Sequence, residues 1–238
     1  MDTTAEDHYN SIVETIERRS KEAGHKVTLV AVSKTKPKEA IEYLYNVYGH
    51  RVFGENYIQE LHEKGTSMEA SYPEIQWHFI GRLQSNKLKL LCSTPNLACI
   101  ETVHSIDIAK HLEKVLAGMN KTLDVMVQIN SSGEEQKGGV EVDEAISVIK
   151  EVMAMEHLRF KGIMTIGMVG AAEENFEVMH TLGERVKSEL GLDHLEISMG
   201  MSADYELAIE KGSTIVRIGT ALFGARDYSK KATTPTSN

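Results

Sequence analysis

Lys34 comes directly after a short run of β-branched and apolar residues, Val27–Ser33 (VTLVAVS). A lysine at the end of such a strand has its stem in apolar surroundings, and desolvation disfavours its ammonium form. The neutral amine is a nucleophile that can form a Schiff base with a carbonyl compound. A lysine that merely extends to solvent is the simpler interpretation, and Lys34 alone does not exclude it. Lys36 competes for the role, but it precedes Pro37 and is expected at the solvated rim.

Two other predicted strand ends carry residues suited to binding a phosphate group. Ser198–Ser202 (SMGMS) follows the seventh predicted strand, and Arg217–Thr220 (RIGT) completes the eighth. In (β/α)₈ barrels, the loops after strands seven and eight often bind phosphate. The expected phosphate-binding residues, two glycines for close backbone approach and two hydroxyl donors, are Gly200, Gly219, Ser198 and Thr220. The alternative is that both glycines only form tight turns.

Arg217 lies one residue inside the last predicted strand, and a buried arginine needs an acceptor. We expect it to pair with an acidic residue or to donate to a ring nitrogen of a bound cofactor. Asn56 and His78, near the second and third strand ends, are expected to point toward the same rim. A single histidine on an apolar strand is more often a hydrogen-bonded core residue than a catalyst, so no catalytic role is assigned to His78.

The elements that must position these residues alternate between short apolar strands and longer amphipathic helices. The predicted strands are Val27–Ser33, Arg51–Gly54, Ile75–Ile80, Leu97–Glu101, Leu123–Ile129, Leu158–Ile166, Leu195–Ser198 and Thr214–Ile218. The predicted helices include Asp7–Ala23, Lys38–Tyr48, Ile106–Met119, Val142–Met155, Glu173–Leu190 and Ala203–Lys211. Several strands are apolar on both faces, as expected where helices cover one side and a barrel interior lies on the other. About eight βα units predict a single α/β (β/α)₈ TIM-type barrel with an extra N-terminal helix; an open doubly wound sheet is the alternative.

Composition limits the organisation and location of the chain. A single barrel domain over 1–228 with a disordered tail over 229–238 fits the 238 residues, since such barrels span roughly 200–250 residues. The N-terminus, Met1–Asn10, has no signal-peptide character, and no stretch reaches the ~20 apolar residues of a membrane span. We therefore expect a cytoplasmic protein, in which Cys92 and Cys99 are ordinary thiols.

The same composition argues against two classes of ligand. The formal net charge is −9 and no basic stretch is interleaved with aromatic residues, so nucleic acid is not an expected partner. No cluster of His, Asp and Glu has the spacing of metal ligands. A small anion in a local cationic pocket remains compatible with the charge.

Several motifs, taken together and in this order, resemble one protein family. They are Ala31–Pro37 (AVSKTKP), Phe53–Tyr57 (FGENY), Trp77–Gly81 (WHFIG), Leu83–Lys87 (LQSNK), Ser198–Ser202 (SMGMS) and Val216–Asp227 (VRIGTALFGARD). The chain is similar to the pyridoxal 5′-phosphate (PLP) homeostasis proteins, small PLP-binding proteins like the N-terminal barrel of alanine racemase. The similarity runs from the first strand to Asp227.

This resemblance implies a role for each candidate residue. It implies that Lys34 holds PLP as a Schiff base, that Arg217 faces the pyridine nitrogen and that Asn56 lies beside the ring. The residues that it places around the phosphate are Ser198, Gly200, Gly219 and Thr220. Around Lys137 the chain departs from the family pattern of a single glycine two residues after the lysine, which puts any auxiliary role of Lys137 in doubt.

The implied function is intracellular PLP homeostasis, as a cofactor carrier or buffer without robust catalysis. An arginine at the pyridine nitrogen discourages its protonation and weakens the ring as an electron sink. Racemisation also needs acid and base groups on both faces of the substrate. The alternatives are a weak PLP-dependent amino-acid racemase and a Schiff-base lyase that acts without PLP. We expect a monomer whose partners are PLP and apo PLP-enzymes.

Overall fold

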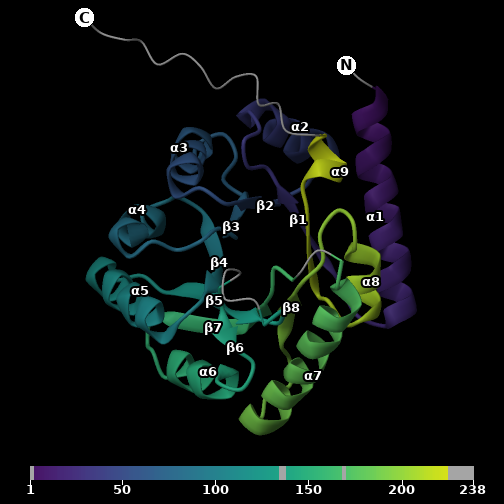
Figure 1. The fold of residues 1–238 in the computed structure, drawn as a ribbon. Helices are drawn as coiled ribbons and strands as arrows, with labels where there is room; N and C mark the ends of the chain where they lie inside the picture. The colour runs from purple at the N-terminus through teal and green to yellow at the C-terminus, as the bar shows by residue number, and fades with distance from the viewer. Residues whose placement is uncertain (1–2, 134–137, 168–169, 225–238) are drawn as a thin grey trace, which may run out of the picture.

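The computed structural model describes residues 3–133, 138–167 and 170–224, with side chains from residue 8 onward. In this part of the chain, parallel strands form a closed barrel with helices around it (Figure 1). The strand order is β4-β3-β2-β1-β9-β8-β7-β5, and pairing between β4 and β5 closes the ring. The predicted (β/α)₈ barrel is therefore confirmed, and the open-sheet alternative is wrong. The predicted tail, 229–238, lies outside the described residues.

The barrel strands overlap the predicted ones throughout. They are β1 Thr28–Val32, β2 Val52–Glu55, β3 Gln76–Phe79, β4 Leu97–Val103, β5 Leu123–Asn130, β7 Leu158–Met164, β8 Glu196–Ser198 and β9 Ile215–Ile218. A short additional strand, β6 Val140–Glu141, pairs with the end of β5 and has no predicted counterpart.

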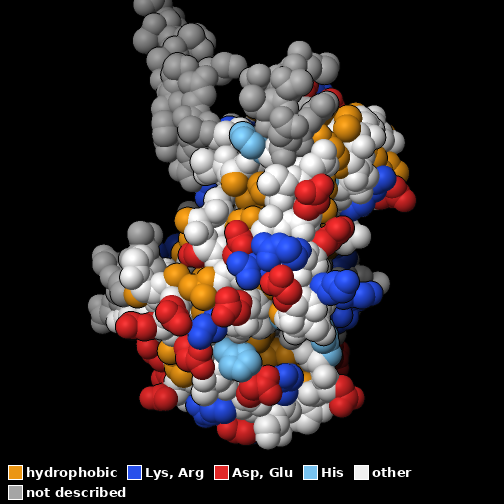
Figure 2. All heavy atoms as spheres, turned by 90° about the vertical axis from the view of Figure 1, so that its right-hand side faces the viewer, with side chains coloured by type: hydrophobic (Ala, Val, Ile, Leu, Met, Phe, Trp, Pro, Cys, Tyr) orange, Lys and Arg blue, Asp and Glu red, His pale blue; other side chains and the backbone are white. Residues whose placement is uncertain are grey.

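The helices follow the strands in the alternation that a parallel barrel requires. They are α1 Thr3–Ala23, α2 Lys38–Tyr48, α3 Ile58–Met68, α4 Leu88–Cys92, α5 Ile106–Met119, α6 Ala145–Met153, α7 Ala172–Leu190, α8 Tyr205–Glu210 and α9 Thr220–Phe223, with a 3₁₀ turn at Ser85–Lys87. The expected N-terminal helix is present as α1. Its residue Arg19 pairs with Glu206 of α8 at 2.9 Å. On the face that carries these helices, acidic and basic side chains are interspersed (Figure 2).

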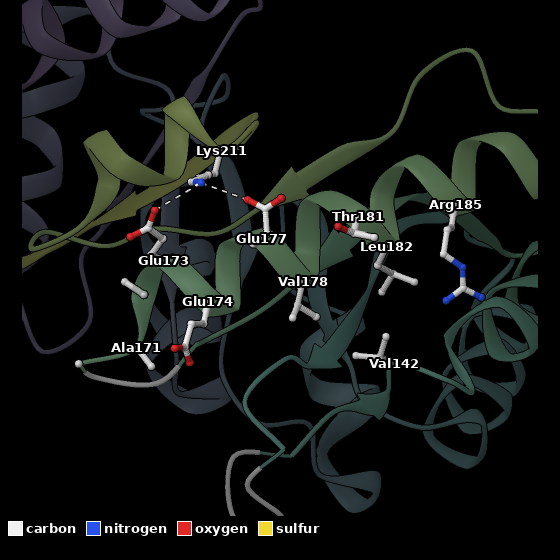
Figure 3. A pocket seen from close by; sticks show the side chains of 12 residues that line it. Val142, Ala171, Glu173, Glu174, Glu177, Val178, Thr181, Leu182, Arg185 and Lys211 are labelled. Carbon is white, nitrogen blue, oxygen red and sulfur yellow. Dashed lines mark hydrogen bonds and ion pairs between the residues drawn. The ribbon is translucent and has the colours of Figure 1, made fainter.

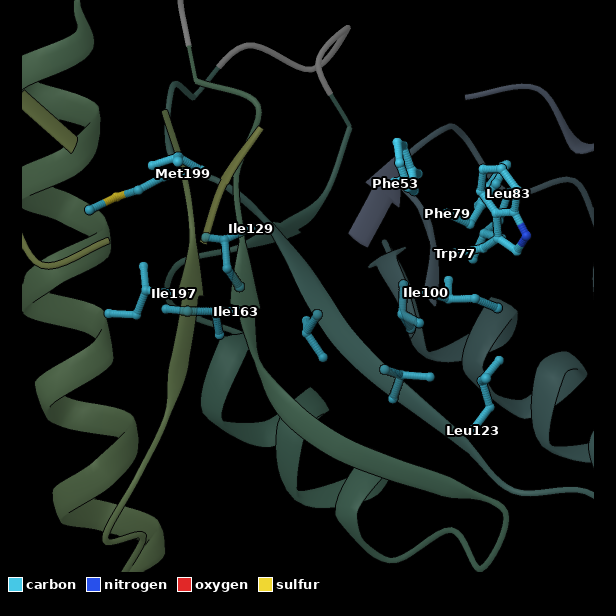
Figure 4. Packing of buried hydrophobic residues seen from close by; sticks show 14 of the residues in the cluster. Phe53, Trp77, Phe79, Leu83, Ile100, Leu123, Ile129, Ile163, Ile197 and Met199 are labelled. Atoms are coloured by element: carbon cyan, nitrogen blue, oxygen red, sulfur yellow. The ribbon is translucent and has the colours of Figure 1, made fainter. Parts of the chain in front are cut away.

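The larger part of the core lies between the strands and the helices. Phe53, Trp77 and Phe79 are almost completely buried there, packed with aliphatic side chains of neighbouring elements (Figure 4). Each such side chain contributes about 1.5–3 kcal/mol by leaving water. Because side chains alternate along a strand, the residue between Trp77 and Phe79, His78, faces the barrel interior.

The barrel interior is more polar than the sequence suggests. A small apolar cluster of Val30, Cys99, Met126, Met164 and Ile215 fills part of it. Buried charged and polar residues of the strands, namely His78, Glu101, Ser198 and Arg217, lie on the same inward face. The expectation that strands are apolar on both faces therefore holds for the helix-facing side and only partly for the interior.

Candidate functional site

A pocket of about 330 Å³ opens at the carboxyl ends of the barrel strands. Its volume is at the lower end of the range for small-molecule sites. Its described lining is Val32, Lys34, Asn56, Ile80, Met164, Ile166, Met201, Ser202, Ala203, Arg217, Gly219 and Thr220. The topology thus brings together Lys34, Asn56, Arg217, Gly219 and Thr220, which are far apart in the sequence. The cationic side chains Lys34 and Arg217 belong to this lining, and no carboxylate does.

Lys34 is half-buried in the loop that follows β1, and its neighbour Thr35 fixes the path of that loop. Thr35 has a φ of 62°, an unfavourable conformation for a β-branched residue. Its backbone N–H donates to the Glu60 carboxylate of α3 at 2.7 Å. The contact stabilises a strained turn immediately beside the candidate nucleophile.

A buried ionic network supports the same loop from below. The Lys64 ammonium of α3 donates to Glu55 at 2.7 Å, to Glu60 at 2.7 Å and to the Ser33 carbonyl at 2.9 Å. The Ser33 hydroxyl also donates to Glu55, at 2.7 Å. Burial raises the pKa of Glu55 to about 7, although Lys64 acts in the opposite direction. One oxygen of Glu55, Oε2, has no hydrogen-bond partner among the described residues.

Lys36, the competing amine, points to a different part of the structure. Its Nζ donates to the carbonyl of Phe223 at 2.8 Å and to that of Gly224 at 3.2 Å. It therefore fastens the loop after β1 to the end of α9. Lys36 does not line the pocket, while Lys34 does.

Arg217 reaches the pocket from β9 and is held by two contacts inside the barrel. Its Nη1 donates to the Ser198 hydroxyl at 2.7 Å, and its Nη2 donates to the Thr165 carbonyl at 2.8 Å. Burial lowers the pKa of Arg217, and the charge of Glu101 partly offsets this effect. A guanidinium has more N–H donors than these two contacts use. Arg217 can therefore bind an acceptor in the pocket.

Glu101 of β4 is the acidic partner that a buried arginine requires, and Ser198 connects the two. The Ser198 hydroxyl donates to Glu101 Oε2 at 2.6 Å. On the other side, His78 Nδ1 lies 2.6 Å from Glu101 Oε1. Burial alone would raise the pKa of Glu101, but its contacts with His78, Arg217 and Ser198 lower it overall. Sequence reasoning had identified Ser198 and Arg217 but not the carboxylate that joins them.

The loop after β8 is shaped by Gly200. Its φ is 92°, and an added Cβ would lie 2.5 Å from the Cβ of Ala208. The Gly200 carbonyl accepts the Arg217 backbone N–H at 3.0 Å, which ties this loop to β9. Gly200 thus has a demonstrable role in the turn, although it is not in the described pocket lining.

The hydroxyl side chains at the pocket differ from the predicted pair. Thr220 lines the pocket as expected, but Ser198 lies in the barrel interior with its hydroxyl hydrogen already donated to Glu101. Ser202 of the same motif lines the pocket instead, and its Oγ accepts the Ala221 N–H at 3.3 Å. That contact joins the loops after β8 and β9.

Asn56 lies where the chain leaves β2, close against the loop after β3. An added Cβ on Gly81 would lie 1.9 Å from the Asn56 carbonyl oxygen, so glycine is required for this close approach. The Asn56 side-chain oxygen is buried and has no hydrogen-bond partner among the described residues. Leaving such an atom unsatisfied costs about 1–3 kcal/mol. It is a ready acceptor for a ligand in the pocket.

His78 does not share the rim with Asn56, so that prediction is wrong. His78 lines a separate hollow of about 270 Å³ at the amino ends of the strands. Strands in a closed barrel are tilted and staggered, so the position of a residue along its own strand does not fix its height. Lys137, whose auxiliary role was in doubt, lies outside the described residues.

A larger hollow of about 750 Å³ lies on the outside of the barrel along α7 (Figure 3). Val142, Val178 and Leu182 contribute apolar surface to it. Both cations in its lining are paired, Lys211 with Glu177 at 3.1 Å and with Glu173 at 3.5 Å, and Arg185 with Glu189 at 3.5 Å. None of the predicted site residues lines this hollow. We therefore place the candidate site in the pocket at the carboxyl ends of the strands.

Comparison with known proteins identifies the family. The chain matches the family "Alanine racemase, N-terminal domain" over residues 8–227. It is 45% identical to the pyridoxal phosphate homeostasis protein of Homo sapiens over 217 residues, which are 86% of this chain and 78% of that protein. The chain belongs to the pyridoxal phosphate homeostasis protein family. The Schizosaccharomyces pombe member is 43% identical over 212 residues, 87% of each chain.

Several solved structures share the barrel fold of this chain. A protein from Bifidobacterium adolescentis aligns with a TM-score of 0.85 and 31% identity, over 94% of this chain and 97% of that one. PipY of Synechococcus elongatus, solved with PLP bound, aligns with a TM-score of 0.80 and 27% identity, over 93% and 100% of the two chains. An alanine racemase of Clostridium difficile shares the fold at 17% identity and a TM-score of 0.67.

No helix within residues 3–133, 138–167 and 170–224 is both long enough and apolar enough to cross a membrane.

Proposed function

We propose that this chain binds PLP in the pocket at the carboxyl ends of the strands and acts in PLP homeostasis. The observation that carries the proposal is the meeting of Lys34, Arg217 and the turns after β8 and β9 in one small pocket. The family consists of proteins named for PLP homeostasis, and the related PipY has been solved with PLP bound.

In this proposal Lys34 forms the Schiff base with the PLP aldehyde. Lys34 lines the pocket, and its loop is fixed by Glu60 and by the network around Lys64. Lys36 is less suited to the role because its Nζ donates to carbonyls at the end of α9. A fixed backbone on both sides of Lys34 reduces the conformational entropy lost when the bond forms.

The phosphate of PLP would lie against the turns after β8 and β9. Ser202 and Thr220 offer hydroxyl groups there, and Gly219 allows close backbone approach. Gly219 is the N-cap of α9 and Thr220 its first residue, and the first backbone N–H groups of a helix have no partner within that helix. Gly200 would support this phosphate site by shaping the turn after β8. Ser198 would support it indirectly, because its hydroxyl accepts a hydrogen bond from Arg217.

The ring of PLP would lie between Asn56 and Arg217. A guanidinium beside the pyridine nitrogen disfavours protonation of that nitrogen because the two positive charges repel. PLP supplies electron-sink chemistry to enzymes, and this chemistry is weakened when the nitrogen stays unprotonated. The arrangement favours a carrier or buffer of PLP over an efficient enzyme.

We further propose that the protein acts as a monomer in the cytoplasm and passes PLP to apo PLP-enzymes. Both described cysteines, Cys92 and Cys99, are free and buried, which is compatible with a reducing compartment.

Borohydride trapping followed by peptide mapping tests the proposal. Purified protein should be yellow, and reduction should fix PLP on the peptide that contains Lys34. Lys34→Ala should lose most of the colour and the trapped adduct, whereas the matched control Lys36→Ala should retain both. Trapping on Lys36 or Lys137 would move the site. A colourless protein that binds no added PLP would instead favour a lyase that works without the cofactor.

A further inference from the structure

A continuous chain of hydrogen bonds crosses the barrel interior from one end to the other. His78 lies 2.6 Å from Glu101, the Ser198 hydroxyl donates to Glu101 at 2.6 Å, and Arg217 donates to Ser198 at 2.7 Å. The side chains come from four strands, β3, β4, β8 and β9. All four residues are buried, with at most 9% of any one exposed.

The two ends of this chain face different hollows. Arg217 lines the pocket at the carboxyl ends of the strands, which is the proposed PLP site. His78 lines the hollow of about 270 Å³ at the amino ends. Its Nδ1 is used by Glu101, while its Nε2 has no partner among the described residues. Nε2 of His78 can therefore accept a proton from the amino-end hollow while Nδ1 keeps its hydrogen bond to Glu101.

Glu101 lies between Arg217 and His78 in this series of hydrogen bonds. Its charge offsets that of Arg217 across the Ser198 hydroxyl, and it also accepts a hydrogen bond from His78. A protonated His78 would form a charge-assisted bond with Glu101. Glu101 would then offset less of the positive charge of Arg217. The potential in the PLP pocket would become more positive, which favours an anionic ligand.

We propose that protonation of His78, at the amino end of the barrel, strengthens the binding of anionic PLP at the carboxyl end, with Glu101 and Ser198 as positioning residues between them. This inference rests on the proposed PLP site. Because coupling between two sites is reciprocal, bound PLP would equally favour the protonated imidazole.

Other titratable groups face the same hollow and must be separated from His78. They lie on β4, β5, β7 and β8 and are Cys99, Asp124, Lys161 and Glu196. Asp124 is paired with Arg159 at 2.6 Å, and Glu196 with His194 at 3.0 Å. A variant that changes His78 alone leaves these groups in place.

The test compares the PLP affinity of wild-type protein and of His78→Asn between about pH 5.5 and 8.5, the range in which histidine titrates. Asparagine retains an N–H donor for Glu101 but cannot be protonated. The ratio of the two dissociation constants cancels the ionisations of PLP and of Lys34. We expect the variant to bind as well as wild type at the alkaline end and roughly fivefold more weakly at the acid end, the lower limit of typical coupling.

His157→Asn is the matched control, because His157 forms a comparable pair with Glu113 at 2.8 Å outside the barrel interior. Its ratio to wild type should stay flat with pH. Parallel profiles for His78→Asn and wild type would overturn the inference while leaving the PLP site intact. Failure of every protein to bind PLP would overturn the proposed function itself.

Should His78→Asn not fold, wild-type protein provides a second measurement. The titration midpoint of the His78 imidazole, followed by nuclear magnetic resonance, should move upward when PLP is added. An unchanged midpoint would contradict the inference.

Discussion

Three lysines near the candidate site illustrate how environment assigns different roles to the same residue type. Lys34 lines the pocket, Lys36 is fastened to the end of α9, and Lys64 is buried in an ionic network. The partner of Lys64, Glu55, is fully buried, and burial raises the pKa of this carboxyl to about 7. The support beneath Lys34 therefore contains a group that titrates near neutral pH.

Glu55→Gln should flatten the pH dependence of stability. Between the ordinary value of 4.5 and about 7, folded Glu55 binds a proton that the unfolded chain releases. The free energy of unfolding of the wild type therefore falls as pH rises through this window, by at most about 3 kcal/mol in total, and is constant above it. Urea denaturation of the apo-protein at several pH values measures the effect. Parallel pH curves for wild type and variant would contradict this assignment.

Ser202→Ala and Ser198→Ala should have different effects, because the Ser202 hydroxyl lines the pocket and the Ser198 hydroxyl lies in the barrel interior. Losing a hydroxyl group in the pocket, in Ser202→Ala or in Thr220→Val, should weaken PLP binding by about 1–3 kcal/mol. The apo-protein should lose less stability in Ser202→Ala than in Ser198→Ala, because the Ser202 hydroxyl makes a single long contact, with the Ala221 N–H at 3.3 Å. Ser198→Ala leaves Arg217 and Glu101 each short of a contact, so it should also lower the free energy of unfolding by about 1–3 kcal/mol. Titration of the apo-proteins with PLP measures the effect on binding, and urea denaturation measures the effect on the free energy of unfolding. Equal effects of both serine variants would argue against this division.

Individual site residues were predictable to different degrees. Lys34 could be predicted because an apolar strand ends at it, and Arg217 because it interrupts an apolar strand. Glu101 could not, because its partners His78 and Ser198 are distant in sequence and are brought to it only by barrel closure. Ser202 could not be distinguished from Ser198, because spacing alone does not tell which of two nearby serines lines the pocket and which lies in the barrel interior.

At the scale of elements, α3 positions the loop after β1. Lys64 and Glu60 lie one helical turn apart, and both contact that loop, through the Ser33 carbonyl and the Thr35 N–H respectively. Strand and helix periodicity predicted the alternation of the barrel, since one apolar face recurs at a period of two or 3.6 residues. It did not predict β6, whose two residues are too few to show a period.

Lys64→Met should loosen the loop that carries Lys34. Removing the ammonium leaves Glu60 and Glu55 with fewer partners, and Glu55 can respond by holding its proton. We expect the free energy of unfolding to fall by about 1–3 kcal/mol and PLP to dissociate faster. Lys110→Met, which breaks an exposed pair with Glu151, is the control and should be nearly neutral.

The double variant Lys64→Met/Glu55→Gln adds a sharper criterion. Removing both members of a buried ion pair is less costly than removing one, so the double variant should recover part of the lost stability. If the two losses simply add, the network does not act as a coupled support for the loop.

At the scale of the whole molecule, a chain with a net charge of −9 presents a local cationic pocket. The described lining contains Lys34 and Arg217 and no carboxylate, so an anionic ligand avoids the repulsion of the acidic surface. The same lining is poor in groups that move protons. His78 faces the opposite hollow, and Tyr57 is 53% exposed and does not line the pocket.

The protein loaded with PLP should therefore turn over amino acids poorly. Racemisation requires an acid and a base on opposite faces of the substrate. In the described lining, Lys34 could act on one face, while Arg217 stays charged and cannot act as a base. After incubation with alanine, serine or lysine, chiral chromatography should find rates far below the ~10 s⁻¹ typical of enzymes. Turnover at an enzyme-like rate that disappears in Lys34→Ala would establish the racemase alternative. Loss of that turnover in Tyr57→Phe would identify Tyr57 as the second proton-transfer group, whereas its persistence would exclude Tyr57 from that role.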